Sequence, residues 1–295
     1  MRFSCLSIVA AVAAATASLG AAAALTPHAP ALSAAARPAT VTLQPAWFAY
    51  RPLGDFEAGG TTIDAPARAT RLDAPLEVMT EPVSQAAYAR CVVAAACARL
   101  KGVDPAADNL PAVGASWLDA TAYAEWYAQA TGEDWHLPSD AEWAYAAAER
   151  FRGEPPAAKS GDDFARRWLA KFDADSAQAR QAKAPQPFGH FGVNALGVAD
   201  LAGNVWEWTS SCYERRAVDP AGAARLLTRN CHVRALEGEH RTFISDFIRD
   251  GVTGGCSVGP PPTNLGFRLV RDRASAVARL LKGVGALFAP PPGAA

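Results

Sequence analysis

Two acidic residues, Asp200 and Glu207, flank a glycine-containing turn in the stretch from residue 197 to 209. Trp206 and Trp208 enclose Glu207, which places a carboxylate between large apolar side chains. Such a carboxylate needs a partner or a metal, because burying it alone is costly. Both acids could face one hard cation, with turn carbonyls as further ligands. The alternative is a tight turn with tryptophan packing and a salt bridge, and the spacing leaves both interpretations open.

A second group of candidate residues lies between positions 231 and 256. His240 and Arg241 follow a glycine, and Asp246 belongs to the same charged run, so these side chains could line a ligand cleft. Cys256 lies on a glycine-rich loop, where an exposed thiol would be reactive if its pKa were lowered. The alternatives are a solvated or core histidine and a salt-bridged surface loop. No histidine lies in an HxH or HExxH pair, so the histidines form no local metal motif.

The first 24 residues predict a cleaved signal peptide. Arg2 precedes an apolar run from residue 6 to 19, and alanines at 22–24 offer a small-x-small cleavage site. An uncleaved anchor is the alternative. A cleaved signal implies a periplasmic or secreted protein, and no other segment is expected to span a bilayer, so we expect no stable membrane span after cleavage.

Cleavage would remove one of the six cysteines and leave an odd number in an oxidising compartment, where disulfides are expected. Cys91 and Cys97 are the preferred pair, provided that the helix carrying Cys91 ends before Cys97. Among Cys212, Cys231 and Cys256 we expect one bridge and one spare thiol. For Cys256 we favour a disulfide to Cys231 or Cys212 over a reactive thiol.

Composition bounds the remaining chain. Its 295 residues carry a formal net charge of −1, which implies no polyanionic partner such as nucleic acid. Its eight tryptophans favour a fold rich in aromatic packing. We predict a disordered linker over residues 25–44, one domain over 45–272, and a C-terminal helix with a Pro/Ala tail over 273–295.

Local patterns predict short strands and three capped helices within the domain. Strands are expected at 46–50, 55–58, 76–79 and 264–270, and Arg268 in the last is expected to be a buried ion-pairing residue. Helices are expected to begin after Ser84, Ser116 and Ser139, since each serine can cap a helix N-terminus. Gly132 is expected to end the second helix. Further short helices are expected at 163–171 and 274–287.

Several motifs agree in order and spacing with one family. They are Pro82–Tyr88 (PVSQAAY), Ala115–Trp126 (ASWLDATAYAEW), His136–Ala147 (HLPSDAEWAYAA), Gly197–Thr209 (GVADLAGNVWEWT) and Asn264–Arg271 (NLGFRLVR). The chain resembles the formylglycine-generating enzyme, or sulfatase-modifying-factor, family. The resemblance implies a single α+β domain with the sulfatase-modifying-factor fold, related to the C-type-lectin-like fold and low in regular secondary structure.

The resemblance also implies a structural calcium ion, Ca²⁺, at the turn between Asp200 and Glu207. Carried over residue by residue, its ligands would be the side chains of Asp200 and Glu207 and the carbonyls of Gly203 and Val205. A second calcium site of the family is expected to be lost, because the corresponding region, residues 171–183, lacks its pattern.

The resemblance is weakest where the family performs catalysis. Formylglycine-generating members use two cysteines to bind copper, and the equivalent positions here fall near Thr242 and Phe247. Without thiols there is no soft copper site, so formylglycine generation is not expected, and a redox metal is left undetermined. Exported branches that also lack this pair are similar, including those of pyoverdine maturation and nitrite-reductase clusters.

Two functions therefore compete. The first is an exported tailoring or maturation factor, in principle an oxidoreductase, that acts on a periplasmic protein or a peptide-derived metabolite. The second is a non-catalytic, lectin-like binding module for a protein or glycan partner. A convergent cluster of titratable side chains in a cleft would favour the enzyme.

Overall fold

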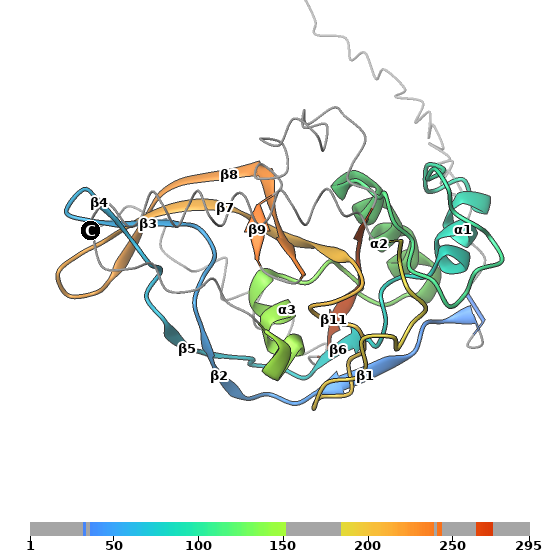
Figure 1. The fold of residues 1–295 in the computed structure, drawn as a ribbon, viewed down its shortest axis with the longest axis horizontal. Helices are drawn as coiled ribbons and strands as arrows, with labels where there is room; N and C mark the ends of the chain where they lie inside the picture. Colours follow the sequence, from blue (N-terminus) through green and yellow to red (C-terminus); the bar gives the residue numbers. More distant parts are fainter. Residues whose placement is uncertain (1–31, 34–35, 152–183, 239–240, 244–263, 274–295) are drawn as a thin grey trace, which may run out of the picture.

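A computed structural model describes residues 32–33, 36–151, 184–238, 241–243 and 264–273. Short strands and three α-helices are distributed along this part of the chain, which confirms the α+β class (Figure 1). The first strands and helices, in chain order, are β1 (Thr40–Leu43), β2 (Trp47–Tyr50), β3 (Asp55–Ala58), β4 (Thr61–Ile63), β5 (Arg68–Arg71), β6 (Leu76–Met79), α1 (Gln85–Val93), α2 (Trp117–Thr131) and α3 (Asp140–Ala147). They are followed by the short 3₁₀ helix η2 (Ala148–Arg150) and by β7 (Trp206–Val218), β8 (Ala224–Glu237), β9 (Thr242–Phe243), β10 (Leu265–Gly266) and β11 (Val270–Asp272).

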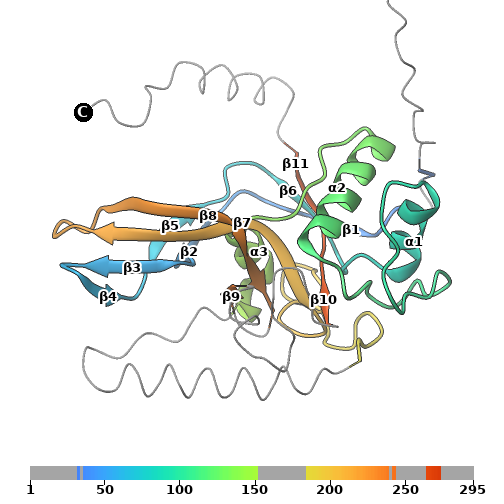
Figure 2. The same cartoon turned by 90° about the horizontal axis from the view of Figure 1, so that it is seen from above.

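The largest described sheet is built on the long antiparallel hairpin of β7 and β8. Its strand order is β4-β3-β7-β8-β9, and β10 pairs in parallel with the start of β7. The hairpin projects from the rest of the molecule, and α1 and α2 lie toward the opposite end (Figure 2). Two smaller sheets, β1-β6-β11 and β2-β5, complete the described strands. The hairpin therefore joins the motif turn before β7 to the segment that follows β8.

Each α-helix begins at the serine that the sequence indicates. Ser84 accepts a hydrogen bond from the Ala87 amide at the start of α1. Ser116 and Ser139 form full capping boxes at α2 and α3, in which the third helical residue bonds back to the serine amide. Gly132 ends α2 in the left-handed conformation, with φ of 69°. The local signals thus determine where α3 begins, and they place Asp140 at its first position.

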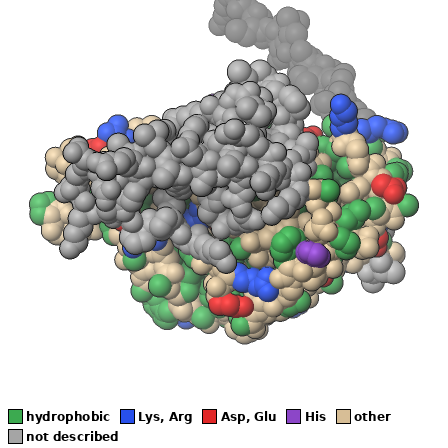
Figure 3. Space-filling model, viewed as in Figure 1, with side chains coloured by type: hydrophobic (Ala, Val, Ile, Leu, Met, Phe, Trp, Pro, Cys, Tyr) green, Lys and Arg blue, Asp and Glu red, His purple; other side chains and the backbone are tan. Residues whose placement is uncertain are grey.

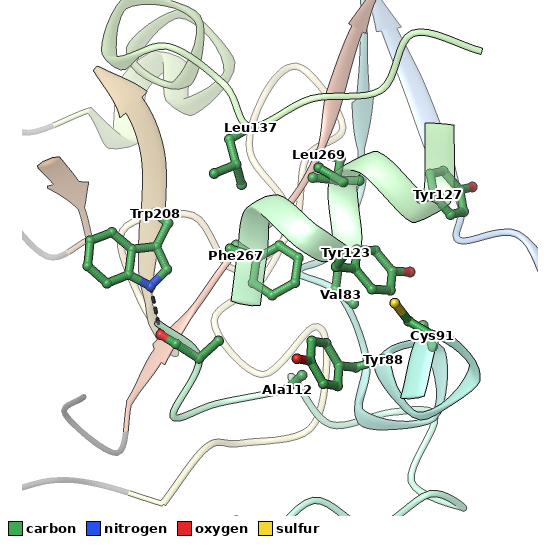
Figure 4. Packing of buried hydrophobic residues seen from close by; sticks show 14 of the residues in the cluster. Val83, Tyr88, Cys91, Ala112, Tyr123, Tyr127, Leu137, Trp208, Phe267 and Leu269 are labelled. Carbon is green, nitrogen blue, oxygen red and sulfur yellow. Dashed lines mark hydrogen bonds between the residues drawn. The ribbon is translucent and has the colours of Figure 1, made fainter. Parts of the chain in front are cut away.

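Aromatic side chains fill the larger of the two core clusters (Figure 4). Tyr123 stacks against Tyr88 and Tyr127, and Phe267 meets Tyr123 edge-on with ring centroids 5.4 Å apart. Trp208 is buried there, and its indole N–H donates to the Ala115 carbonyl at 2.8 Å. The packing joins α1, α2, β7 and the closing segment, as expected of a tryptophan-rich chain.

Two expected boundaries need correction. β1 lies inside the stretch predicted as linker, because residues 40–43 pair antiparallel with β6 and bury Leu43. The single strand predicted at 264–270 is divided into β10 and β11, and these strands join different sheets. The chain crosses between the sheets at Phe267 and Arg268, so both side chains enter the interior.

Several predictions fall outside the described residues: the signal peptide, the helices at 163–171 and 274–287, and the absence of the second calcium site at 171–183. These remain predictions. Within the part of the chain that the structure describes, no helix is long and apolar enough to cross a membrane.

Two disulfides connect the described cysteines. Cys91 bonds to Cys97 as predicted, since α1 ends at Val93 and lets the chain return. Cys212 bonds to Cys231 across the β7–β8 hairpin. The favoured disulfide from Cys256 to one of these cysteines is therefore wrong, because strand pairing brings the two together. Cys256 itself lies outside the described residues.

Candidate functional site

The motif turn before β7 is a strained loop folded against residues 186–191. Asp200, Ala202 and Asn204 all have positive φ, a conformation that most side chains disfavour. The Asp200 carboxylate compensates by accepting the amides of Gly189 and Phe191, at 2.7 and 2.8 Å. These bonds hold the turn in one conformation and use one acceptor position on each carboxylate oxygen.

Glu207, at the other end of the turn, is neutralised by a protein cation. Arg268 donates to both of its carboxylate oxygens at 2.7 Å, and the Trp143 indole N–H donates to Oε2 at 2.9 Å. The remaining guanidinium donors reach backbone carbonyls, those of Met79, Thr80 and Ala199. Arg268 is therefore the buried ion-pairing residue that the sequence predicted, and the salt-bridge interpretation of Glu207 describes what this side chain contacts.

These contacts bear on the calcium prediction for Asp200, Gly203, Val205 and Glu207. A carboxylate has about four acceptor positions, of which Asp200 uses two and Glu207 three. Burial raises the pKa of Glu81, and the nearby Asp200 carboxylate adds to the rise, although Arg268 opposes it. Asp200 therefore has more acceptor positions left for a cation than Glu207, whose charge Arg268 already neutralises. No group of three or more His, Cys, Asp or Glu side chains within the described ranges is arranged to hold a metal.

A second buried charge cluster surrounds Arg241, which the sequence marked as a weak catalytic candidate. Its guanidinium contacts the carboxylates of Asp140 and Glu237, the latter at 3.2 Å. Tyr50 donates its hydroxyl to Asp140, and its ring lies 5.4 Å from the Arg241 guanidinium carbon. Arg241 is only 1% exposed, so the surface-loop interpretation is wrong for this residue. Its positive charge binds two acids from different elements, Asp140 of α3 and Glu237 of β8.

Asp140 and Glu237 form a buried pair of acids whose pKa values shift in opposite directions. One oxygen of each, Oδ1 and Oε2, has no hydrogen-bond partner among the described residues if both groups are carboxylates. Burial raises the pKa of Glu237 well above its ordinary value, and the charge and hydrogen bond of Asp140 add to the rise. Burial also pushes the pKa of Asp140 upward, but hydrogen bonds from Glu237, Arg241 and Tyr50 and the Arg241 charge outweigh it and lower the pKa. A protonated Glu237 that donates to an ionised Asp140 satisfies both oxygens.

The two acids of this pair come from different secondary-structure elements, α3 and β8. Asp140 is the first residue of α3, where the helix N-terminus favours negative charge, and its amide donates to the Ser211 hydroxyl of β7. Glu237 is the last residue of β8, which pairs with β7. The β7–β8 hairpin therefore brings a helix start and a strand end together, with Tyr50 of β2 beside them.

A cavity of about 490 Å³ opens against this cluster. Asp140 and Tyr50 form part of its wall, and residues of β7 such as Ser211 and Cys212 form another. The charged side chains of its lining are of both signs: Arg68, Asp140, Glu214, Arg216 and Arg229. The cavity is large enough for a small ligand or for one side chain of a peptide.

The other catalytic candidates, His240, Asp246 and Cys256, lie outside the described residues and remain predictions. The cluster instead contains three residues that sequence reasoning missed: Tyr50, Asp140 and Glu237. Asp140 was visible only as part of a helix-capping pattern, and Glu237 only as the end of a strand. The position of Asp140 at the start of a predicted helix could have marked it as a candidate, but nothing in the sequence indicated that Glu237 would be its partner.

Surface charge is dispersed on the face shown in Figure 3. The described Lys and Arg side chains lie there in small separate groups, interspersed with apolar and neutral surface. The net charge of −1 agrees with this pattern. The prediction that no nucleic acid is bound remains a prediction.

Fold and site together define a class: an α+β domain of short strands and capped helices, with two buried acid–arginine clusters around a long hairpin. The sequence profile of the sulfatase-modifying factor enzyme 1-like domain matches residues 31–273. The chain belongs to this family, as its motifs predicted.

Named relatives include both active and inactive proteins. The formylglycine-generating enzyme of Mycobacterium tuberculosis (strain ATCC 25618 / H37Rv) is 30% identical over 190 residues, which cover 56% of this chain and 58% of the relative. That of Streptomyces coelicolor (strain ATCC BAA-471 / A3(2) / M145) is 31% identical over 184 residues, 56% of this chain and 53% of the relative. The inactive C-alpha-formylglycine-generating enzyme 2 of Mus musculus is 30% identical over 166 residues, 54% and 48% of the two chains. The aligned region thus spans about half the length of these relatives.

Among solved structures, PvdO from Pseudomonas aeruginosa matches with a TM-score of 0.49 and 18% identity, over 80% of this chain and 95% of that one. The structure of CarF matches with a TM-score of 0.44 and 18% identity, over 81% and 99% of the two chains.

Proposed function

We propose that the protein is a tailoring or maturation factor that uses the Asp140–Glu237 pair for proton transfer to a substrate bound in the adjacent cavity. The observation that carries this proposal is the buried pair of acids held by Arg241, with Asp140 in the cavity wall. Acids with perturbed pKa values beside a cavity are typical of catalytic sites and therefore favour a catalyst over a binding module.

The chemistry that the pair supports is general acid–base catalysis. Burial and the Asp140 charge raise the pKa of Glu237 and favour its protonated form, whereas the pKa of Asp140, which is bonded to Tyr50 at the cavity wall, is lowered. Asp140 can accept a proton from a bound group, which leaves the pair neutral, and the return of that proton to the product restores the starting state while Arg241 remains charged throughout. Arg241 thereby fixes the positions of both carboxyl groups without itself facing the substrate.

The substrate is proposed to be a periplasmic protein or a peptide-derived metabolite, because a predicted signal peptide directs the chain to that compartment. Formylglycine generation is not proposed. The four described cysteines are in disulfides, and the two positions equivalent to the copper ligands are predicted to fall near Thr242 and Phe247. An oxidoreductase role remains part of the proposal at the level of class only.

The experiment compares a deletion strain of the source organism complemented with wild-type protein, with Glu237→Gln or with an empty vector. Extracts of the periplasm and medium are compared by mass spectrometry for peptides and metabolites. We expect one product to disappear in the deletion and in the Glu237→Gln strain, although the variant protein accumulates normally. A product restored in full by Glu237→Gln would contradict acid–base catalysis by this pair.

The second candidate is a non-catalytic binding module, which the similarity to relatives named as inactive supports. It predicts a different outcome in the same experiment. Deletion would change no covalent product, and a partner cross-linked to wild-type protein would be captured equally by Glu237→Gln.

A further inference from the structure

The two described disulfides differ in their surroundings. Cys91 is fully buried and Cys97 is 9% exposed, within the aromatic core cluster. Cys212 lies partly exposed in the cavity wall, and its partner Cys231 is exposed on the neighbouring strand. One disulfide is therefore shielded from solutes, whereas the other is open to them.

A cation lies against the open disulfide. Arg234, which pairs with Cys212 in the β7–β8 ladder, brings its Nη1 to 3.3 Å from Cys212 Sγ. The same nitrogen donates to the Ser210 carbonyl at 2.7 Å, and the guanidinium carbon lies 3.9 Å from the Trp117 ring centroid. Trp117 and Ser210 thus hold the charge beside the sulfur.

Arg234 has no carboxylate partner among the described contacts, and its buried Nε makes no hydrogen bond there. Glu214, an acid on its facing strand, is already paired with Arg216 and Arg229. A guanidinium in this position stabilises a thiolate at Cys212 more than it stabilises the neutral disulfide, because only the thiolate carries a charge.

We propose that Cys212–Cys231 is a redox-active disulfide that oxidises dithiols of a peptide or protein substrate, with Arg234 as a positioning residue. A substrate thiolate attacks the exposed Cys231 Sγ and forms a mixed disulfide, and the Cys212 thiolate leaves beside Arg234. The second substrate thiolate then attacks the substrate sulfur of the mixed disulfide and releases the Cys231 thiolate. The substrate gains a disulfide, and its two electrons remain on the two cysteine thiolates of this protein.

This activity is independent of the Asp140–Glu237 pair. It uses other residues, Cys212, Cys231 and Arg234, and different chemistry, and it is measured with a model thiol in place of the natural substrate. The experiment below can therefore fail while the proposed function holds, and the reverse is equally true.

The first experiment uses native full-length protein and reduced glutathione. Samples are acid-quenched and alkylated over time, and mass spectrometry measures reduction of each disulfide. We expect Cys212–Cys231 to be reduced at least about tenfold faster than Cys91–Cys97, which serves as an internal control. Equal rates, or faster reduction of Cys91–Cys97, would overturn the proposal.

Variants then separate a redox role from a structural one. Cys212→Ser leaves Cys231 as a free thiol, and we expect it to react with added oxidised glutathione to give a stable mixed disulfide on Cys231, with release of one reduced glutathione. In the Arg234→Gln variant, Cys212–Cys231 should be reduced about tenfold more slowly than in wild type. The pKa that governs alkylation of the Cys212 thiol should be raised. Arg234→Lys retains the charge, so its reduction rate and its alkylation pKa should both lie close to the wild-type values. If Arg234→Gln changes only the melting temperature and leaves the alkylation pKa unaltered, Arg234 is structural and the proposal fails.

Discussion

Arg268 donates one hydrogen bond of 2.7 Å to each carboxylate oxygen of Glu207, and both side chains are 1% exposed. The pair connects the motif turn before β7 with the segment between β10 and β11. Removal of either partner leaves an uncompensated buried charge, which is far more costly than loss of a surface ion pair.

We therefore expect Arg268→Met to lower the free energy of unfolding by about 3–5 kcal/mol. Chemical denaturation of the purified protein measures the loss. Arg215→Met is the matched control, because Arg215 pairs with Glu57 at 2.5 Å with more than half of its side chain exposed. The control should change stability little. Similar losses in the two variants would contradict a special role for the buried pair.

Glu237→Gln is expected to change how stability depends on pH. The raised pKa means that folded Glu237 keeps its proton above the ordinary value of 4.5, where the unfolded carboxyl loses it. Wild-type stability from this group is thus fully present below pH 4.5 and is lost as pH rises toward the folded pKa. Gln cannot titrate, so the variant should gain stability relative to wild type as pH rises above 4.5.

Denaturation curves at several pH values test this expectation. Asp140 acts in the opposite sense, because its pKa is lowered: its stabilisation is present above 3.8 and is lost as pH falls through the folded pKa. An Asp140→Asn variant should therefore lose its difference from wild type in acid. Parallel pH profiles of wild type and Glu237→Gln would show that the pair does not share a proton.

Calcium removal tests the sequence prediction for the motif turn. If calcium binds beside Asp200, a chelator should lower the melting temperature, and Ca²⁺ but not Mg²⁺ should restore it. Saturation at a hundred times the dissociation constant corresponds to about 2.7 kcal/mol of stabilisation. Asp200→Asn is the test variant, and its melting temperature should respond less to Ca²⁺. No response of the wild-type protein to either treatment would refute the site.

Signal-peptide cleavage can be checked by intact-mass measurement of protein recovered from the periplasm or medium. We expect the mature chain to begin after the alanines at 22–24 and to lack Cys5. Replacement of the alanines by large residues should leave the precursor uncleaved. Recovery of the full-length chain from the cytoplasm alone would refute export.

Local elements were largely predictable. Ser116 and Ser139 each precede an acid by three residues, a spacing that satisfies two helix-end amides at once, and both helices begin there. β3 and β6 have the predicted bounds, because apolar residues enclosed by turn signals leave few alternatives. The motifs also identified the family, which the profile match to residues 31–273 confirms.

The long hairpin was not predictable in the same way. β7 and β8 contain many charged and polar residues and irregularities of register, and they lack a continuous alternating apolar pattern. Their pairing depends on each other and on β3, not on local preference. The cysteine connectivity followed from that pairing, so the sequence left Cys212, Cys231 and Cys256 undecided.

The sequence by itself determined where the helices start, to which family the chain belongs and that Arg268 forms a buried ion pair. Each of these depends on residues close in the chain or on motifs in register. Only the tertiary structure decided which acids meet Arg241 and which cation faces Cys212. Asp140 and Glu237 are far apart in sequence, and they meet because α3 packs against the β7–β8 hairpin. The opposite shifts of their pKa values arise from burial and from neighbouring charges, and neither exists until the chain has folded.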